Sequence, residues 1–226
     1  MHEIARGIYA IDGLKMGRSY LVEGHDGLAL VDTSSKSAAA GIIAAIEGIG
    51  RRPEDLRTIV ATHYHFDHTG NVDKLIDRSG AELCVHADDA PYVEGRSAWL
   101  PSKGLIGPML NKVAPAQFTL KVDRALQDGD ALAFGGGLQV IHAPGHTPGH
   151  IALYAKERRT LFAGDALMNV GGLRLPLSMT SHDMEQAKRS VRQLVELDFD
   201  IALPGHGAPI LGRANEKIAE WARRWL

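Results

Sequence analysis

Short apolar runs occupy the first thirty residues of the chain, and glycine-containing turns separate them. The runs Ile8–Asp12, Ser19–Glu23 and Leu28–Val31 have the length and the β-branched or aromatic content of strands. Consecutive strands joined by short turns pair with one another. The chain is therefore predicted to open as a β-meander.

Helical periodicity begins after the third strand, where apolar residues between positions 39 and 46 recur at i, i+3, i+4 and i+7. We expect Ser34 or Ser35 to cap this helix and Gly48 and Gly50 to end it. A later helix is expected to begin at a capping box of Thr180 and Asp183. The other expected elements are strands at 58–61, 82–85, 138–142, 151–154, 161–163 and 201–203, and helices at 72–76, 184–195 and 214–225, the last with Trp221 and Trp225 in its buried stripe.

Residues 94–115 interrupt this α/β alternation, because they are rich in Gly and Pro and yet carry large apolar side chains. A solvated linker would be more polar. We expect the segment to form a lid, a pocket wall or a dimer interface, and packing on its own core is an equal alternative. With this insertion, the 226 residues fit a single domain.

Charge and composition exclude several classes of function. The net charge is −2 and no block of Lys and Arg occurs, so binding to nucleic acid is not expected. No apolar run is long enough to cross a membrane, and Met1–Arg6 lacks the pattern of a signal peptide, so we expect a cytoplasmic protein. The one cysteine, Cys84, lies in an expected buried strand and excludes an internal disulfide.

Four ligand-type side chains lie within six residues, directly after the expected strand at 58–61. They are His63, His65, Asp67 and His68. On an extended loop, residues i and i+2 point the same way, so His63 and His65 can hold one metal ion, and the other two can turn toward a second ion. Imidazole nitrogen and carboxylate oxygen suit Zn²⁺ or another first-row ion.

Three further stretches have the same character, because each places a histidine or aspartate in a small-residue turn after an expected strand. They contain His146, Asp165 and His206, and the first continues to His150. Glycine and proline in these turns fix the loop and let the backbone approach a metal closely. Each turn alone is a common pattern, but together they bring seven ligand-type residues to strand ends.

In order and spacing these residues resemble the metallo-β-lactamase fold superfamily, over nearly the whole chain. The resemblance implies a four-layer αβ/βα sandwich that binds two divalent metal ions, zinc first, with iron or manganese open. It also implies that Asp165 bridges the two ions and that Asp32 supports the ligands from behind. His150 follows the His146 loop and starts an expected strand, so for this residue a supporting role behind the ligands and a plain structural role are equal alternatives. The implied ligands are His63, His65 and His146 for one ion, and Asp67, His68 and His206 for the other.

Such a ligand set implies hydrolysis. A hydroxide between two ions has a pKa near 7 and can attack a carbonyl that one ion polarises, while Asp67 exchanges a proton. We therefore expect a hydrolase that cleaves a carboxylic ester, lactone or thioester. The alternatives are a mononuclear iron oxidoreductase of the sulfur-dioxygenase kind, a metal-binding or interaction module without catalysis, and hydrolysis of a phosphoester or, as a side activity, a β-lactam.

The sequence departs from several branches of the superfamily, and these departures narrow the range of expected activities. The common subclass of zinc β-lactamases has Cys where Asp165 stands, and flavodiiron proteins have Glu where His65 stands. Glyoxalase-II-type thioesterases carry a helical extension, whereas only 20 residues follow His206 here. The related lactonases place Tyr at the position of Met168, so a lactonase would have to work without that phenol.

The pocket is predicted from apolar side chains on expected loop edges, and a small-molecule substrate with an acyl chain or aryl group is favoured. A homodimer is left open by the apolar insertion and the terminal tryptophans. The apolar residues expected to line the pocket are Leu14, Met16, Trp99, Leu105, Ile106, Met109 and Met168. His182 is a further candidate for pocket contact, because it lies near an expected helix start after Asp165, and a plain structural role is its alternative.

Overall fold

A computed structural model of the chain describes residues 1–101, 104, 108 and 119–226. Among these residues, seven strands form the first sheet in sequence order. The first four strands pair antiparallel, and the last three continue the sheet in parallel. These strands are β1 (His2–Ala5), β2 (Ile8–Ala10), β3 (Tyr20–Glu23), β4 (Leu28–Val31), β5 (Leu56–Val60), β6 (Glu82–His86) and β7 (Arg124–Leu126).

The second sheet has six strands within the described part of the chain, in the order β15-β14-β11-β10-β9-β8. Its one parallel pair is β11 with β14, and the other neighbours run antiparallel. A small hairpin, β12 (Met168–Asn169) with β13 (Leu173–Arg174), lies outside both sheets. The strands of the second sheet are β8 (Ala131–Leu132), β9 (Leu138–His142), β10 (Ile151–Ala155), β11 (Thr160–Gly164), β14 (Ile201–Pro204) and β15 (Ile210–Leu211).

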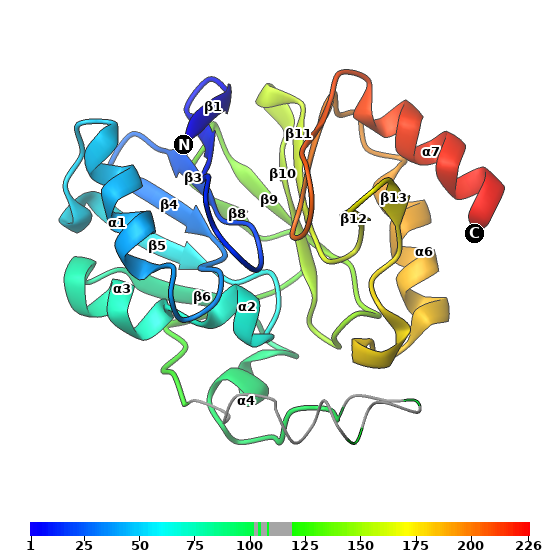
Figure 1. Cartoon of the computed structure of the whole chain (residues 1–226), viewed down its shortest axis with the longest axis horizontal. Helices are drawn as coiled ribbons and strands as arrows, with labels where there is room; N and C mark the ends of the chain where they lie inside the picture. The colour runs from blue at the N-terminus through cyan, green and yellow to red at the C-terminus, as the bar shows by residue number, and fades with distance from the viewer. Residues whose placement is uncertain (102–103, 105–107, 109–118) are drawn as a thin grey trace.

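Helices cover the outer face of each sheet, so the predicted four-layer αβ/βα sandwich is confirmed (Figure 1). The helices α1 (Ala39–Gly48) and α3 (Val72–Ser79) lie on the first sheet, and α6 (Met184–Leu194) and α7 (Ala214–Trp225) lie on the second. Two one-turn helices, α2 (Phe66–Thr69) and α4 (Ala90–Val93), follow β5 and β6 in the loops at the strand ends.

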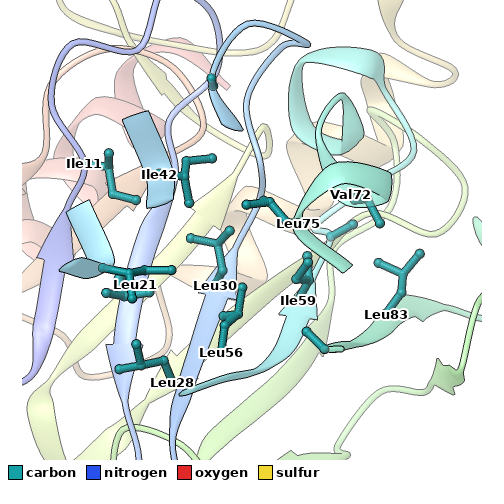
Figure 2. Close-up of a cluster of buried hydrophobic side chains, with 14 of the residues drawn as sticks. Ile11, Leu21, Leu28, Leu30, Ile42, Leu56, Ile59, Val72, Leu75 and Leu83 are labelled. Carbon is teal, nitrogen blue, oxygen red and sulfur yellow. The ribbon is translucent and has the colours of Figure 1, made fainter. Parts of the chain in front are cut away.

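Three apolar layers hold the sandwich together. One lies between the first sheet and its helices, where Ile42 of α1 and Leu75 of α3 pack on Leu30 and Ile59 (Figure 2). A second layer joins the two sheets, and a third lies under α6 and α7. Because burying one such side chain stabilises the fold by about 1.5–3 kcal/mol, these layers fix the relative positions of the strand ends.

Two predicted helix caps are wrong. The first helix begins after Ala38 rather than at a serine cap, and the Ala39 N–H donates to Asn71 Oδ1 (3.2 Å), an acceptor 32 residues away. Thr180 lies in a separate short 3-10 turn, and Asp183 alone caps α6 by accepting from the Gln186 N–H at 2.9 Å. Local patterns missed the first cap because its acceptor comes from another element.

Two other expectations on the elements also need correction. Trp225 is 68% exposed, so the buried stripe of α7 ends at Ala222. The strand β1 was not predicted, because it is a short edge strand in which two of the four residues, His2 and Glu3, are polar and exposed. Most of the predicted insertion at 94–115 lies outside the described residues. No helix in the described part of the chain has the length and apolar character needed to cross a bilayer.

Candidate metal centre

The strand order brings the ligand-type side chains to one edge of the sandwich. The strands β4 and β5 are parallel neighbours, as are β11 and β14, so their carboxyl ends point to the same edge. Asp32, His63, Asp165 and His206 follow these four ends directly or within three residues, and His146 follows β9, which runs in the direction of β11. The site therefore lies where the loops of the two sheets meet.

His63, His65 and His146 form the first group. The His63 Nε2 and His65 Nδ1 atoms are 3.1 Å apart, and the ring of His146 lies 4.7 Å, centroid to centroid, from each of the other two rings. All three side chains can direct one nitrogen to a common point. His63 and His146 are buried, and His65 is half-buried.

Hydroxyl groups set the tautomers in this group. The Thr62 hydroxyl has a single proton, which it donates to Asp32 Oδ2 (2.8 Å), so it accepts from His63 Nδ1–H at 3.1 Å. The Ser181 hydroxyl likewise donates to the Leu177 carbonyl (2.9 Å) and accepts from His146 Nδ1–H at 3.0 Å. Both imidazoles therefore keep a lone pair on Nε2, which is the form that binds a metal.

Asp67, His68 and His206 form the second group. His206 Nε2 lies 3.3 Å from Asp67 Oδ2 and 3.4 Å from His68 Nε2. His68 is buried and the other two side chains are half-buried, so this group faces the solvent side of the site.

Asp165 lies between the two groups and contacts both. Its Oδ2 atom is 3.6 Å from His146 Nε2 and 3.4 Å from His206 Nε2, and its Oδ1 atom is 3.5 Å from His68 Nε2. Gly205 permits this arrangement, because a Cβ atom there would lie 2.1 Å from Asp165 Oδ1. A single carboxylate can thus serve both groups.

The donor set fits metal ions on two counts. Two buried atoms of the site, His146 Nε2 and Asp165 Oδ1, have no hydrogen-bond partner among the described residues, and such atoms are costly unless something else binds them. Ions bound about 2.0–2.1 Å from each donor place donors on a tetrahedron about 3.3–3.4 Å apart, and the separations given above are 3.1–3.6 Å. Zinc and iron both accept these donors.

The two groups differ in electrostatics. Burial lowers the pKa of His65 to about 4, and burial likewise holds the pKa of His63 well below its usual value. Burial also disfavours the charged form of His68 and His206, but neighbouring carboxylates outweigh it and raise the pKa values to about 9 and about 10. Burial would raise the pKa of Asp67, but the adjacent imidazoles lower it to about 2.

Asp32 supports the second group. Its carboxylate accepts from His68 Nδ1–H (2.8 Å) and from the Thr62 N–H (2.7 Å), besides the Thr62 hydroxyl. It is buried and has a positive φ of 60°, which a non-glycine residue rarely adopts. Such strain recurs at functional sites, and here it aims the carboxylate at a ligand-type histidine.

His150 supports Asp165 from behind. Its Nδ1–H donates to the Ala143 carbonyl (3.0 Å), which leaves Nε2 to accept from the Asp165 N–H at 2.8 Å. The ring is buried. His150 therefore holds the backbone of Asp165 and directs no atom of its own to the first group.

The residues predicted to line a pocket have mixed outcomes. Met16 is 47% exposed, and its carbonyl accepts a hydrogen bond from the hydroxyl of Ser34, two residues after Asp32. Trp99 packs on Tyr64, the residue between His63 and His65, at 5.9 Å between ring centroids. Their role toward substrate stays a prediction. Leu14 packs on the first core layer, Met168 is half-buried in β12, His182 is exposed and donates its N–H to the His146 carbonyl, and Leu105, Ile106 and Met109 lie outside the described residues.

Another histidine pair lies at the back of the His146 loop. His86 and His142 can approach Asp88, but their rings are stacked at 4.1 Å with an interplanar angle of 13°. His142 Nε2–H also donates to the Pro148 carbonyl at 2.9 Å. An ion bound by both imidazoles would have to lie in both ring planes, which stacked parallel rings do not allow. We therefore assign no metal to this group.

Sequence reasoning missed the residues that hold the ligands in place from elsewhere in the chain. Ser181 is 35 residues from His146, and no local pattern connects the two. Thr62 could have been found, because it directly precedes His63. Asp89 is buried and accepts hydrogen bonds from both ligand loops, but its position before a one-turn helix is that of an ordinary cap.

Solved structures share this fold. A metallo-beta-lactamase family protein of Thermus thermophilus, TTHA1429, superposes with a TM-score of 0.77 at 23% identity, over 98% of this chain and 80% of the other. The protein TTHA1623, solved in a di-iron-bound form, superposes with a TM-score of 0.71 at 27% identity, over 93% of this chain and 97% of the other.

Relatives in sequence include hydrolases. The probable metallo-hydrolase YflN of Bacillus subtilis (strain 168) is 27% identical over 98% of this chain and 92% of its own length. The acyl-coenzyme A thioesterase MBLAC2 of Gallus gallus is 31% identical over 80% of this chain and 66% of its own length. The model of the metallo-beta-lactamase superfamily matches residues 12–206, a range that includes every ligand-type residue of both groups. The chain therefore belongs to the metallo-beta-lactamase superfamily.

Proposed function

We propose that this protein is a binuclear metal-dependent hydrolase of carboxylic esters, lactones or thioesters, with an acyl thioester as the favoured substrate. The observation that carries the proposal is the position of Asp165, whose two oxygens lie 3.4–3.6 Å from imidazole nitrogens of both groups. The preference for a thioester is supported by the acyl-coenzyme A thioesterases among the relatives, at 31–32% identity.

Seven side chains would hold the two ions. His63, His65 and His146 would bind one ion and Asp67, His68 and His206 the other, with Asp165 shared between them. Bound there, the ions would supply Lewis acidity and a nucleophile derived from water near neutral pH. Zinc is the first choice for this donor set, and iron is the alternative.

The chain's own contribution is orientation and proton transfer. Thr62 and Ser181 keep the metal-binding nitrogens of two imidazoles unprotonated. Asp67 is ionised at neutral pH, because the adjacent imidazoles lower its pKa to about 2. Its carboxylate can therefore accept a hydrogen bond from the attacking water and orient it for proton transfer. Hydrolysis of a thioester adds water to the carbonyl carbon and breaks the C–S bond, and the thiolate that leaves takes up the proton.

The test combines metal analysis with substrate screening. Purified protein is stripped with a chelator, reloaded with zinc, iron or manganese, and assayed on an acyl-coenzyme A, an aryl ester, a lactone and a phosphoester. We expect two metal equivalents per chain and hydrolysis that chelation abolishes, fastest on the thioester. His63→Ala and Asp165→Ala should lose turnover, and Asp88→Asn, outside both groups, should keep it.

Two outcomes would overturn the proposal. Hydrolysis that persists in His63→Ala and Asp165→Ala after loss of metal is confirmed would place the chemistry elsewhere. One iron per chain, with oxygen consumed in the presence of a persulfide and no hydrolysis, would replace it with the sulfur-dioxygenase alternative.

A further inference from the structure

Asp89 is a buried carboxylate that joins the loops of the first histidine group. It is the residue before α4, where an aspartate ordinarily caps the helix with its side chain. Here the side chain makes no cap hydrogen bond and is completely buried. It turns instead toward the two loops that carry His63, His65 and His146.

Three donors from these loops converge on the carboxylate. Asp89 Oδ2 accepts from the N–H of Tyr64 (3.0 Å) and from the hydroxyl of Thr147 (2.7 Å), and Oδ1 accepts from the N–H of Gly149 (2.6 Å). Tyr64 belongs to the loop after β5 in the first sheet, and Thr147 and Gly149 belong to the loop between β9 and β10 in the second. Asp89 Oδ2 thus connects the residue after His63, in a loop of the first sheet, to the residue after His146, in a loop of the second.

Gly149 allows the close approach of the two loops at Asp89. A Cβ atom at Gly149 would lie 2.4 Å from the Asp89 backbone nitrogen and 2.8 Å from its Cβ atom, so only glycine allows the approach. Among the described residues, Asp89 forms no ion pair, and burial raises its pKa to about 7 in spite of the three donors. A buried carboxylate without a cationic partner is costly, so its hydrogen bonds must be made fully to keep it in place.

We infer that Asp89 is a positioning residue for the first metal group, which sets the distance between the His63–His65 loop and the His146 loop. This inference rests on the proposed function only in that the first group binds a metal ion. Asp89 is outside both groups of ligand-type side chains. It acts through Tyr64, whose N–H lies between the two ligands of one loop, and through Thr147, which follows the ligand of the other.

Asparagine at position 89 cannot replace the carboxylate. All three partners are donors, and an amide has only one accepting oxygen. If the NH₂ group takes the place of Oδ1, it faces the Gly149 N–H. If it takes the place of Oδ2, it faces the Tyr64 N–H. The fold should survive, because the Ile151 N–H still donates to the Thr62 carbonyl (2.9 Å) across the same interface. We expect the zinc affinity of the first group to fall about 10–100-fold, the usual effect of losing a ligand's supporting partner.

The experiment measures zinc affinity by chelator competition, one group at a time. On a His206→Ala background the first group is measured, and Asp89→Asn should weaken it. On a His65→Ala background the second group is measured, and Asp89→Asn should change its zinc affinity less than about twofold. A general loss of structure would instead weaken both groups. Asp88→Asn is the matched control, because it removes the adjacent exposed carboxylate and should leave both affinities unchanged.

Thr147 provides a second variant that removes only one hydrogen bond. Thr147→Val should weaken the first group about tenfold, whereas Thr147→Ser keeps the hydroxyl and should restore the affinity of the wild type. Equal zinc affinity in Asp89→Asn and the wild type, or equal weakening of both groups, would overturn the role of Asp89. Absence of zinc binding in the unsubstituted protein would instead overturn the metal centre, and the role of Asp89 with it.

Discussion

Replacing Ser181 by alanine tests whether the tautomer of His146 is set by the protein. The Ser181 hydroxyl donates its only proton to the Leu177 carbonyl, so toward the imidazole it can only accept, and it fixes the proton on His146 Nδ1. In Ser181→Ala nothing accepts from Nδ1. The proton can then move to Nε2, which has no hydrogen-bond partner in the described part of the chain and lies 3.6 Å from Asp165 Oδ2.

The size of the effect follows from the burial of both groups. Ser181 and His146 are 4% and 3% exposed, so water cannot readily replace the lost acceptor. Leaving a buried N–H without a partner costs about 1–3 kcal/mol. In the tautomer that binds the metal, Nδ1–H is the group left without a partner, so this cost is subtracted from the free energy of zinc binding. The zinc affinity of the first group then falls about 5–150-fold, at about 1.4 kcal/mol per factor of ten.

The assay is chelator competition on the His206→Ala background, where only the first group remains. The control is Ser190→Ala, because Ser190 is also buried and donates to the Pro144 carbonyl of the same loop (2.7 Å), and among the described residues it makes no hydrogen bond to an imidazole. This control should lower the unfolding free energy by about 0.5–1.5 kcal/mol and leave zinc affinity unchanged. Equal zinc affinity in Ser181→Ala and the control would refute the reasoning.

Three other predictions concern the second group and the contact between the sheets. In the metal-free protein, carboxylates raise the pKa values of His68 and His206 to about 9 and about 10 in spite of burial, so both carry protons at pH 7. Zinc must displace these protons to bind. Chelator competition should therefore show the zinc affinity of the second group rising between pH 7 and 9, by about tenfold per pH unit for each proton displaced. A zinc affinity that does not change with pH would contradict this prediction. Gly205→Ala places a Cβ atom 2.1 Å from Asp165 Oδ1 and should lower the bound metal below two equivalents by elemental analysis, which unchanged stoichiometry would rule out. Tyr20→Phe leaves the buried Pro204 carbonyl of the opposite sheet without its donor (2.7 Å) and should lower the unfolding free energy by about 1–3 kcal/mol in denaturant titration, with no change in metal content.

The elements that sequence analysis predicted well are those whose signal is local and periodic. The strand Leu28–Val31 has the predicted bounds, because it is a continuous apolar run that ends at a polar residue. The cap of α1 could not be predicted, since its acceptor is Asn71, far along the chain. The exposed Trp225 was misplaced because helical spacing identifies a face of α7 and does not say where the core beneath that face ends.

The same division applies to the site. The seven ligand-type residues could be found because metal ligands are restricted to a few side chains and here follow strand ends in small-residue turns, and the structure brings all seven together. Their hydrogen-bond partners could not be found in the same way. A serine or a threonine is common anywhere in a chain, and Ser181 has a distinct role only because the fold brings it to His146.

Asp89 shows why the supporting residues are the harder part of such a site to recognise. In sequence it precedes Ala90 and Pro91, and an aspartate followed by proline at a helix start is the ordinary pattern of an N-cap. In the structure the backbone of Asp89 begins α4, whereas its side chain accepts hydrogen bonds from two other loops. A carboxylate that satisfies three donors from two sheets restricts those loops more than a cap would, since moving either loop leaves a buried donor unpaired. The spacing of the first histidine group is therefore determined outside the ligand motifs, by a residue whose local sequence indicates only the start of a helix.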